Sequence, residues 1–286
     1  MNKKPIKIIN TFVNAKKYLE AVKEENSNQE KLWHEYMIEP FWGEIAQYAP
    51  FDVSSKQPKP VQDVMALEKQ ITEFEKVELQ KLQLEFERIA EALPSDDEDP
   101  MFVALYPICD SQSSVKNKQN GVVGEEVFGN VILNINPLAV NFDKWISYVF
   151  AHEYQHNLWG HHWYVVKGGQ GLSNSFLEYL ITEGQADLFA MSMYPDLEPQ
   201  WNRLFDDETT KQLWSKVEPI LDNTERFSDL HAKYMFGNEE EELPWCMGYT
   251  FGLMIVSDYM SVHSEISFSE LIEVSAKEMF EASRFS

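Results

Sequence analysis

The chain contains little cysteine and no long apolar segment. Cys109 and Cys246 are the two cysteines in 286 residues, too few for a disulfide framework, and neither has a histidine close by at ligand spacing. We therefore expect two buried thiols in a reducing compartment. No segment has the apolar length of a signal sequence or a membrane span. These absences predict a cytoplasmic protein that has no part in a membrane.

Positive charge is also scarce. The sequence has 24 lysine and arginine residues against 47 aspartate and glutamate residues, which gives a net charge of −23. Such an acidic chain repels phosphate backbones and anionic lipid surfaces, and no basic stripe offsets this repulsion. We therefore expect no nucleic-acid partner. The 44% hydrophobic and 13% aromatic content is enough to fill the core of one large domain or two modest ones.

One stretch of the sequence concentrates the chemistry. Residues 147–158, SYVFAHEYQHNL, predict an amphipathic helix that carries the pattern His-Glu-x-x-His. His152 and His156 lie one turn apart on one helical face and can bind the same metal ion, while Glu153 can reach a water on that ion. Apolar side chains continue the stripe that holds the histidines, so the pair faces the interior, where a polar group needs a partner.

A second predicted helix, from Ser175 to about Tyr194, carries paired carboxylates. Glu183 and Asp187 lie one turn apart on a stripe that is otherwise apolar, so both point into the protein. Unpaired buried carboxylates are unfavourable, and a metal site supplies what they lack. Glu183 completes a three-ligand set that leaves the fourth position to water, and Asp187 can accept the ring N–H of a ligand histidine. We expect Gly184 to let the two helices approach closely.

The order of these motifs resembles the gluzincin branch of zinc metallopeptidases, of which the thermolysin-like enzymes are the best known. More closely, residues 101–259 resemble the predicted Zn-dependent protease family named domain of unknown function 2268. Three features carry this likeness: a strand at residues 129–137, the Glu-Gly-x-Ala-Asp run that begins at Glu183, and Gly-Tyr-Thr-Phe-Gly at residues 248–252. The resemblance implies a zincin-like core, bound Zn²⁺ and a peptide or protein substrate.

We predict an α+β fold that is mostly helical, with a small sheet ahead of the His-Glu-x-x-His helix. The first 95 residues predict helices, including one long amphipathic helix over residues 61–93, which contain no glycine or proline. Pro94 and the acidic run at residues 96–99 end this region. The expected organisation is an N-terminal helical region at residues 1–95 and a zincin-like metallopeptidase domain at residues 96–286. A loop inside one continuous domain is the alternative.

After this boundary the pattern changes to strands. Residues 101–108 form an apolar run and predict a buried strand, and residues 131–135 predict a second strand after a polar loop. In zincins the corresponding strand lies at the sheet edge and pairs with the extended substrate. The resemblance therefore makes residues 131–136 the expected site of peptide docking by strand addition, unless this strand lies inside the sheet.

Two residues in the helical C-terminal third are candidates to donate a hydrogen bond to the reaction's oxyanion. Tyr249 lies in the Gly-Tyr-Thr-Phe-Gly stretch, and the resemblance favours it. His231 is the second candidate. Each has a structural alternative, because Tyr249 can be a core aromatic with a satisfied hydroxyl and His231 a surface side chain.

The function that these residues predict together is zinc-dependent hydrolysis of peptide bonds. His152, His156 and Glu183 hold the metal, and Glu153 takes a proton from the attacking water and gives it to the leaving amine. Two other classes stay open. A metal-stabilised binding protein without catalysis has no use for Glu153. A di-iron oxidase of the helical-bundle kind needs a second Glu-x-x-His, which the chain lacks.

Overall fold

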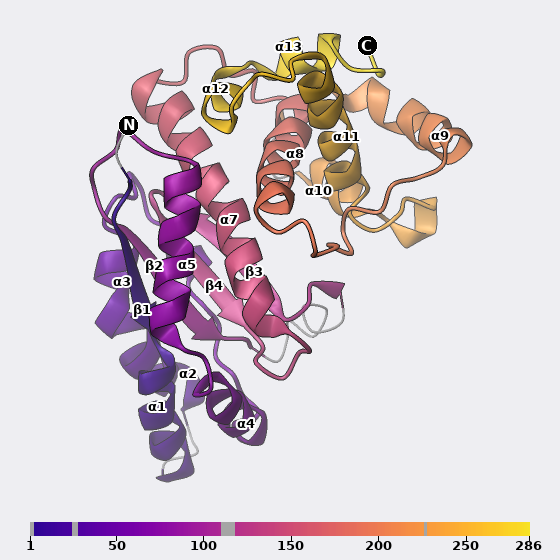
Figure 1. Cartoon of the computed structure of the whole chain (residues 1–286). Helices are drawn as coiled ribbons and strands as arrows, with labels where there is room; N and C mark the ends of the chain where they lie inside the picture. Colours follow the sequence, from indigo (N-terminus) through magenta and orange to yellow (C-terminus); the bar gives the residue numbers. More distant parts are fainter. Residues whose placement is uncertain (1–2, 25–27, 110–117, 226–227) are drawn as a thin grey trace. The chain divides into compact units, whose positions relative to one another are not determined.

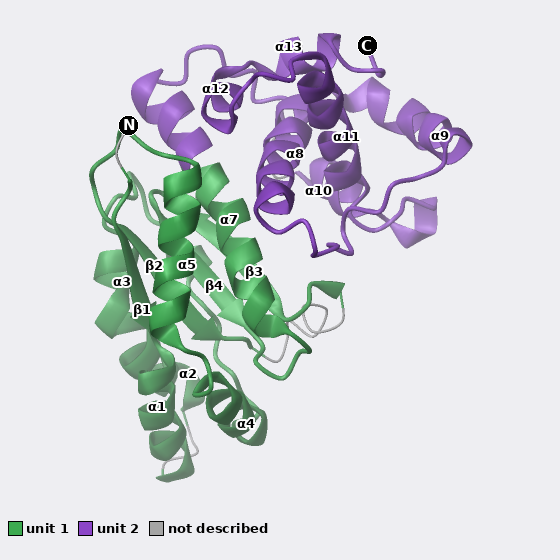
Figure 2. Ribbon diagram, in the orientation of Figure 1, with its two compact units in different colours: residues 1–157 green, residues 158–286 purple. Residues whose placement is uncertain are grey.

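The computed structural model of the chain describes residues 3–24, 28–109, 118–225 and 228–286. The chain divides into two compact units, Met1–Asn157 (unit 1) and Leu158–Ser286 (unit 2), which Figure 2 shows in different colours. The division falls inside the helix α7, Phe142–Gly160. The domain boundary that the sequence predicts between residues 95 and 96 stays a prediction.

Unit 1 is built around a four-stranded mixed sheet (Figure 1). The strand order is β1-β2-β4-β3, in which β2 is parallel to both β1 and β4, and β3 is antiparallel to β4. Its elements in chain order are β1 (Ile6–Asn10), α1 (Phe12–Glu24), α2 (Gln29–Trp33), the π-helix η1 (His34–Ile38), α3 (Glu39–Ile45), the 3₁₀ helix η2 (Ser54–Lys56), α4 (Val64–Phe74), α5 (Leu79–Ala92), β2 (Met101–Pro107), β3 (Val122–Val127), β4 (Asn130–Ile135) and α7.

The sequence predicts a purely helical N-terminal region, but the first described element of this region is a strand. β1 pairs with β2 in register from Ile6 opposite Met101 to Asn10 opposite Leu105. The isoleucine-rich run of β1 suits a pleated surface, where β-branched side chains pack well. Residues at the start of the chain therefore complete a sheet whose other strands lie about a hundred residues later.

The single helix predicted over residues 61–93 is two helices, α4 and α5, with a turn between them. The two halves pack against different partners. Phe74 of α4 stacks on Phe12 of α1 with ring centroids 3.7 Å apart, whereas Phe86 of α5 stacks on Phe150 of α7 at 4.0 Å. The break lets each apolar stripe reach its own partner, which one straight helix does not allow.

Helices cover both faces of the sheet, with α5 and α7 on one face and α3 on the other (Figure 1). Asn130 of β4 points to the α3 face, where its amide donates to the carbonyls of Glu44 and Ile45. Because side chains alternate along a strand, residues 131, 133 and 135 point to the opposite face. The helix that carries His-Glu-x-x-His therefore lies over that second face.

The strand predicted to dock a peptide lies inside the sheet, so that prediction is wrong. β4 is paired on both sides, with β2 and with β3, and has no free edge. The edge strand beside it is β3, in a stretch for which the sequence predicts a polar loop. Its sequence, Val-Val-Gly-Glu-Glu-Val, lacks the strict alternation of apolar and polar residues that marks a half-buried strand.

Unit 2 is helical. Buried side chains of several of its helices, such as Leu180, Phe251 and Met279, share one core. Its elements after α7 are the π-helix η4 (His161–Val166), α8 (Phe176–Met193), α9 (Asp207–Val217), the 3₁₀ helix η5 (Glu218–Ile220), α10 (Asp229–Phe236), the 3₁₀ helix η6 (Glu239–Glu241), α11 (Met247–Val262), α12 (Phe268–Glu273) and α13 (Ala276–Glu281).

The centre of unit 2 is a close crossing of α8 and α11. A β-carbon placed on Gly184 of α8 would lie 2.2 Å from the carbonyl carbon and oxygen of Gly252, and one on Gly252 would lie 1.9 Å from the carbonyl oxygen of Leu180. The two backbones are therefore in direct contact. Gly184 therefore allows a close approach of α8 to α11, while the predicted approach of α8 to the His-Glu-x-x-His helix stays a prediction.

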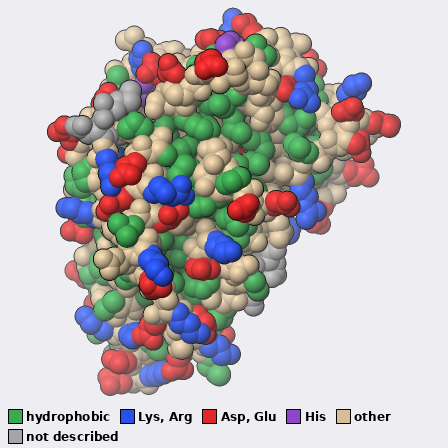
Figure 3. Space-filling view, viewed as in Figure 1, with side chains coloured by type: hydrophobic (Ala, Val, Ile, Leu, Met, Phe, Trp, Pro, Cys, Tyr) green, Lys and Arg blue, Asp and Glu red, His purple; other side chains and the backbone are tan. Residues whose placement is uncertain are grey.

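The two units confirm the predicted fold class, a mostly helical α+β chain with a small sheet ahead of the His-Glu-x-x-His helix. Both cysteines are buried thiols outside any disulfide, as predicted. Within the described ranges, every helix is too short or too polar to cross a bilayer. On the face seen in Figure 3, acidic and basic side chains are interspersed.

Candidate metal centre

The histidine pair lies on α7, as the sequence predicts. The Nε2 atoms of His152 and His156 are 2.9 Å apart, and the two rings meet edge to face. Two nitrogens that bind one tetrahedral zinc ion at the usual bond length lie about 3.3 Å apart. His152 is buried and His156 is partly buried. Helix pitch alone therefore directs both nitrogens at one point, at a separation close to that of two ligands of one metal ion.

Glu153 lies against the sheet at one residue, Gly124 of β3. A β-carbon placed on Gly124 would lie 2.3 Å from Cγ, 2.5 Å from Oε1 and 2.6 Å from Cδ of Glu153. Real β-carbons do not approach other atoms so closely, so any side chain at position 124 would displace the glutamate. Glu153 is 8% exposed. The missing side chain at position 124 therefore leaves the space that this carboxylate occupies.

A second carboxylate, Glu126, points at the same helix. Its Oε1 accepts a hydrogen bond from Nδ2 of Asn157, 3.3 Å away. Asn157 follows Glu153 by one helical turn, about 6 Å, and Glu126 follows Gly124 by two strand residues, about 6.7 Å. Because the two repeats nearly match, α7 runs along β3 with its polar residues facing alternate strand positions.

Glu126 is also held by contacts within unit 1. Burial raises the pKa of its carboxyl, while the hydrogen bond from the backbone N–H of Gly129 and the positive charge of Lys56 oppose that shift. Nothing in the sequence singles out Glu126 as a site residue. Its signal is weak, because two adjacent glutamates in an acidic chain indicate a solvated loop until β3 is recognised as a strand.

The second predicted helix is present as α8, and it begins where expected. Ser175 is the N-cap, and its side chain accepts a hydrogen bond from the N–H of Glu178. Glu183 is 8% exposed and Asp187 is fully buried. Oδ1 of Asp187 accepts a hydrogen bond from Nε1 of Trp201, 3.1 Å away. Asp187 thus holds the segment after α8 to the helix, a contact that sequence spacing does not predict, while its contact with a ligand histidine stays a prediction.

Tyr249 lies in the first turn of α11, beside the crossing with α8. Burial raises the pKa of its hydroxyl well above the ordinary value, and the negative charge of Glu183 adds to that shift. The hydroxyl is therefore protonated at neutral pH and is a hydrogen-bond donor. Two of the predicted site residues, Glu183 and Tyr249, are thus brought within electrostatic range of each other inside unit 2.

His231 is buried, so the alternative of a surface histidine is wrong. The residue lies on α10 with no exposed surface, and its ring lies 5.0 Å from that of Phe176. Its Nε2 is 3.2 Å from the carbonyl oxygen of Asn223, to which a ring N–H donates. That carbonyl also accepts from the N–H of Phe176, at the start of α8. His231 therefore holds the segment after η5, which in turn contacts the start of α8, and its role as an oxyanion donor stays a prediction.

Among the described residues, His152, His156 and Glu183 make up the group of three or more potential ligands that could hold a metal ion. A family model described as predicted Zn-dependent protease (DUF2268) matches residues 72–281, most of the chain. The chain belongs to this family. Neither the curated proteins nor the solved structures yield a match. The family description therefore indicates the general class of activity. The details of the site must be inferred from the residues of this chain.

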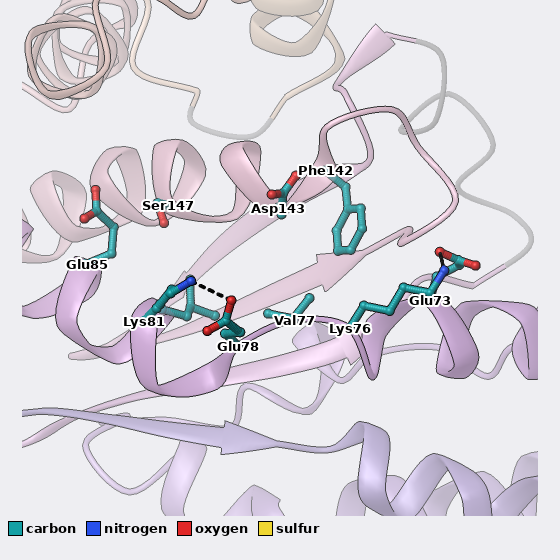
Figure 4. Close-up of a pocket in the computed structure, with 10 residues that line it drawn as sticks. Glu73, Lys76, Val77, Glu78, Lys81, Glu85, Phe142, Asp143 and Ser147 are labelled. Atoms are coloured by element: carbon teal, nitrogen blue, oxygen red, sulfur yellow. Dashed lines mark hydrogen bonds and ion pairs between the residues drawn. The ribbon is translucent and has the colours of Figure 1, made fainter.

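The large cavity of unit 1 contains none of these ligands. It has a volume of about 510 Å³ and is lined by α4, α5 and the start of α7 (Figure 4). Glu73 pairs with Lys76, and Glu78 pairs with Lys81, along its wall. The histidine pair lies further along α7 than the residues that line this cavity.

Proposed function

We propose that this chain is a zinc peptidase that hydrolyses peptide bonds, with zinc held by His152, His156 and Glu183. Glu153 is the general base, and Tyr249 stabilises the oxyanion. The observation that carries the proposal is the arrangement on α7. There, one ring nitrogen of His152 and one of His156 converge on one point, and the carboxylate of Glu153 lies against β3. A site that only stabilised the fold would not need that carboxylate.

The donor set fits zinc. Two imidazoles and one carboxylate are the ligands of a catalytic zinc site, which keeps its fourth position for water or substrate. When bound, zinc would lower the pKa of that water and polarise the substrate carbonyl. A di-iron centre instead needs four carboxylates and two histidines, and the ligand group found in the described part of the chain has three members.

The proton transfers fall to Glu153. As a carboxylate it accepts a proton from the attacking water while the water oxygen bonds to the carbonyl carbon of the peptide. It then donates that proton to the leaving nitrogen as the carbon–nitrogen bond breaks, which regenerates the carboxylate. The protonated hydroxyl of Tyr249 donates to the carbonyl oxygen as negative charge develops there.

The edge of β3 is the proposed docking site for the peptide backbone. The two-residue turn between Val127 and Asn130 closes on a hydrogen-bonded pair, so alternate residues of β3 direct their N–H and C=O groups away from β4. These residues are Val122, Gly124 and Glu126. Since Gly124 also contacts Glu153, a peptide paired with this edge lies beside the general base.

Metal analysis of the purified protein tests the ligand set. We expect about one zinc per chain, lost in His152→Ala, His156→Ala and Glu183→Ala, because three protein ligands are the usual set for such a site. His161→Ala, a change in the π-helix that continues α7, is the matched control and should keep its zinc. Full occupancy after any two of the three ligand changes would contradict the assignment.

Cleavage of fluorescein-labelled casein and of internally quenched peptides tests the base. Glu153→Gln should keep zinc and fold but lose cleavage, because the amide cannot accept the proton. Equal cleavage by wild type and Glu153→Gln would show that a contaminating protease is responsible. Zinc binding without cleavage in the wild-type protein would favour the metal-stabilised binding protein.

A further inference from the structure

β3 is the outer strand of the described sheet, and contacts within unit 1 occupy both ends of its outer edge. At one end, the N–H of Val122 donates to the carbonyl of Gln119, 3.2 Å away. At the other end, Nζ of Lys56 donates to the carbonyl oxygen of Glu126 at 2.9 Å and pairs with Oε1 of Glu125 at 2.9 Å. Between these contacts, the part of unit 1 that the structure describes leaves the C=O of Val122, both groups of Gly124 and the N–H of Glu126 directed outward from the sheet.

The segment that carries Lys56 is fixed across the end of β3. We call residues 51–56 the strap. The ring of Phe51 meets that of Phe128, in the β3–β4 turn, edge to face with centroids 4.8 Å apart. Val53 is buried, and Asp52 accepts hydrogen bonds from the N–H and the hydroxyl of Ser54. Two contacts on different residues of the hairpin therefore hold the strap in place, one through Phe51 and one through Lys56.

We propose that Lys56 is a specificity-determining residue that limits how far a bound peptide extends on one side of the cleaved bond. The inference rests on the proposed function and on β3 as its docking edge. If one residue of a bound peptide pairs with Gly124, the residue two positions further along the peptide lies opposite Glu126. Its N–H would donate to the Glu126 carbonyl, which already accepts a hydrogen bond from Lys56. Longer peptides must displace the ammonium group, which also separates it from Glu125.

A simpler role for Lys56 is protection of the edge. Lysines on edge strands prevent pairing between copies of a protein, and that role requires no substrate. The two roles predict different results. Protection alone makes removal of the amine cause self-association and leaves peptide selection unchanged, whereas a limit on the bound peptide changes selection on one side of the cleaved bond only.

The test compares wild type with Lys56→Met, which keeps an unbranched side chain but has no N–H donor. Two sets of internally quenched peptides are extended by one to four residues, one set on each side of a fixed cleavage site. We expect Lys56→Met to raise the kcat/KM of the longer peptides about 2- to 10-fold, the effect of one hydrogen bond, in one set alone. Lys59→Ala, an exposed lysine near the strap, is the control for charge and should match wild type.

Binding of the same peptides to zinc-loaded Glu153→Gln, with and without Lys56→Met, separates this inference from the proposed function. If wild type cleaves nothing but the double variant binds long peptides more tightly than Glu153→Gln, the limit stands and the proposed activity fails. An unchanged length profile, an equal gain in both sets, or self-association as the only effect of Lys56→Met overturns the inference. So does the absence of peptide binding to both proteins.

Discussion

The two parts of the candidate centre are held in place by different means. In unit 1, His152 and His156 are brought together by helix pitch, and Glu153 occupies space that is free because position 124 has no side chain. In unit 2, Glu183 lies on a helix whose backbone touches that of α11 through Gly184 and Gly252. The unit 1 part thus depends on the positions of polar side chains, and the unit 2 part depends on close packing of two helix backbones.

This difference predicts two kinds of damage. A β-carbon in unit 1 at Gly124 meets the flexible side chain of Glu153, which can move away and leave the fold intact. A β-carbon in unit 2 at Gly184 meets backbone atoms of α11, which can move only if the helices separate. Substitutions in the first region should therefore alter chemistry, and substitutions in the second should alter stability first.

The largest effect is expected for Gly184→Ala. Its β-carbon would lie 2.2 Å from the carbonyl carbon and oxygen of Gly252, so α8 and α11 must move apart. Overpacking of this kind costs about 1–3 kcal/mol or more, which exceeds the ~0.5–1 kcal/mol that alanine gains over glycine in a helix. Urea denaturation should show a lower midpoint for this variant.

Gly160→Ala is the matched control for this comparison. Gly160 also lies in a helix, and a β-carbon placed there would have no atom within 4 Å. We expect unchanged stability or a gain of up to ~1 kcal/mol. Equal midpoints for Gly184→Ala and wild type would show that the crossing of α8 and α11 is looser than its glycines require.

The next largest effect is expected for Gly124→Ala, in activity and not in stability. The new β-carbon displaces the Glu153 carboxylate, while both histidines keep their places on α7. Because general-base catalysis contributes about 10²–10⁴-fold, kcat should fall by about 10²-fold or more with zinc content unchanged. Single-turnover cleavage and metal analysis on the same preparation measure both quantities.

Gly43→Ala serves as the control in unit 1, since a β-carbon at Gly43 in α3 has no neighbour within 4 Å. It should cleave like wild type. A wild-type kcat for Gly124→Ala would mean that Glu153 is not the base, whereas a loss of zinc would mean that β3 positions the metal ligands too.

Local chemistry explains which parts of the molecule can be predicted from its sequence. The helices α7 and α8 and the placement of His152, His156 and Glu183 on buried stripes follow from a period of 3.6 residues, which needs no knowledge of the rest of the fold. The contacts that position Glu153 and Asp187 involve Gly124 and Trp201, and no periodic pattern links those pairs.

The position of β4 inside the sheet could not be predicted for a related reason. It depends on pairing with β2 on one side and with β3 on the other, and β3 has no clear strand signal. The break between α4 and α5 could not be predicted either. It occurs without a glycine or proline, because the two helices pack against different partners. Tertiary contacts override local preference at both places.

Tyr249→Phe should lower kcat less than the largest fall expected for Gly124→Ala, and it should affect the catalytic step alone. Loss of one oxyanion donor costs about 10²–10³-fold in kcat, and zinc affinity should stay unchanged. Burial raises the pKa of this hydroxyl above 10.0, so the donor persists and the wild-type pH profile should show no loss from Tyr249 ionisation up to that pH. Tyr234→Phe, on α10, controls for the loss of a hydroxyl in unit 2. Loss of zinc in Tyr249→Phe would instead place its hydroxyl at the metal.

The smallest effect is expected for Asp187→Asn. This variant tests whether Asp187 of unit 2 contributes to the zinc affinity of the site. The carboxylate accepts from Nε1 of Trp201. If it also accepts a ring N–H from His152 or His156, the amide should weaken zinc affinity by roughly 10–100-fold. Trp201→Phe removes the indole donor but leaves the carboxylate, so its zinc affinity should match wild type. Zinc titration of both variants decides between the two roles. Equal losses of zinc affinity would show that Asp187 acts by holding the segment at Trp201. Unchanged zinc affinity in both variants would remove Asp187 from the site, because an acceptor that orients a metal ligand cannot be neutralised without weakening metal binding.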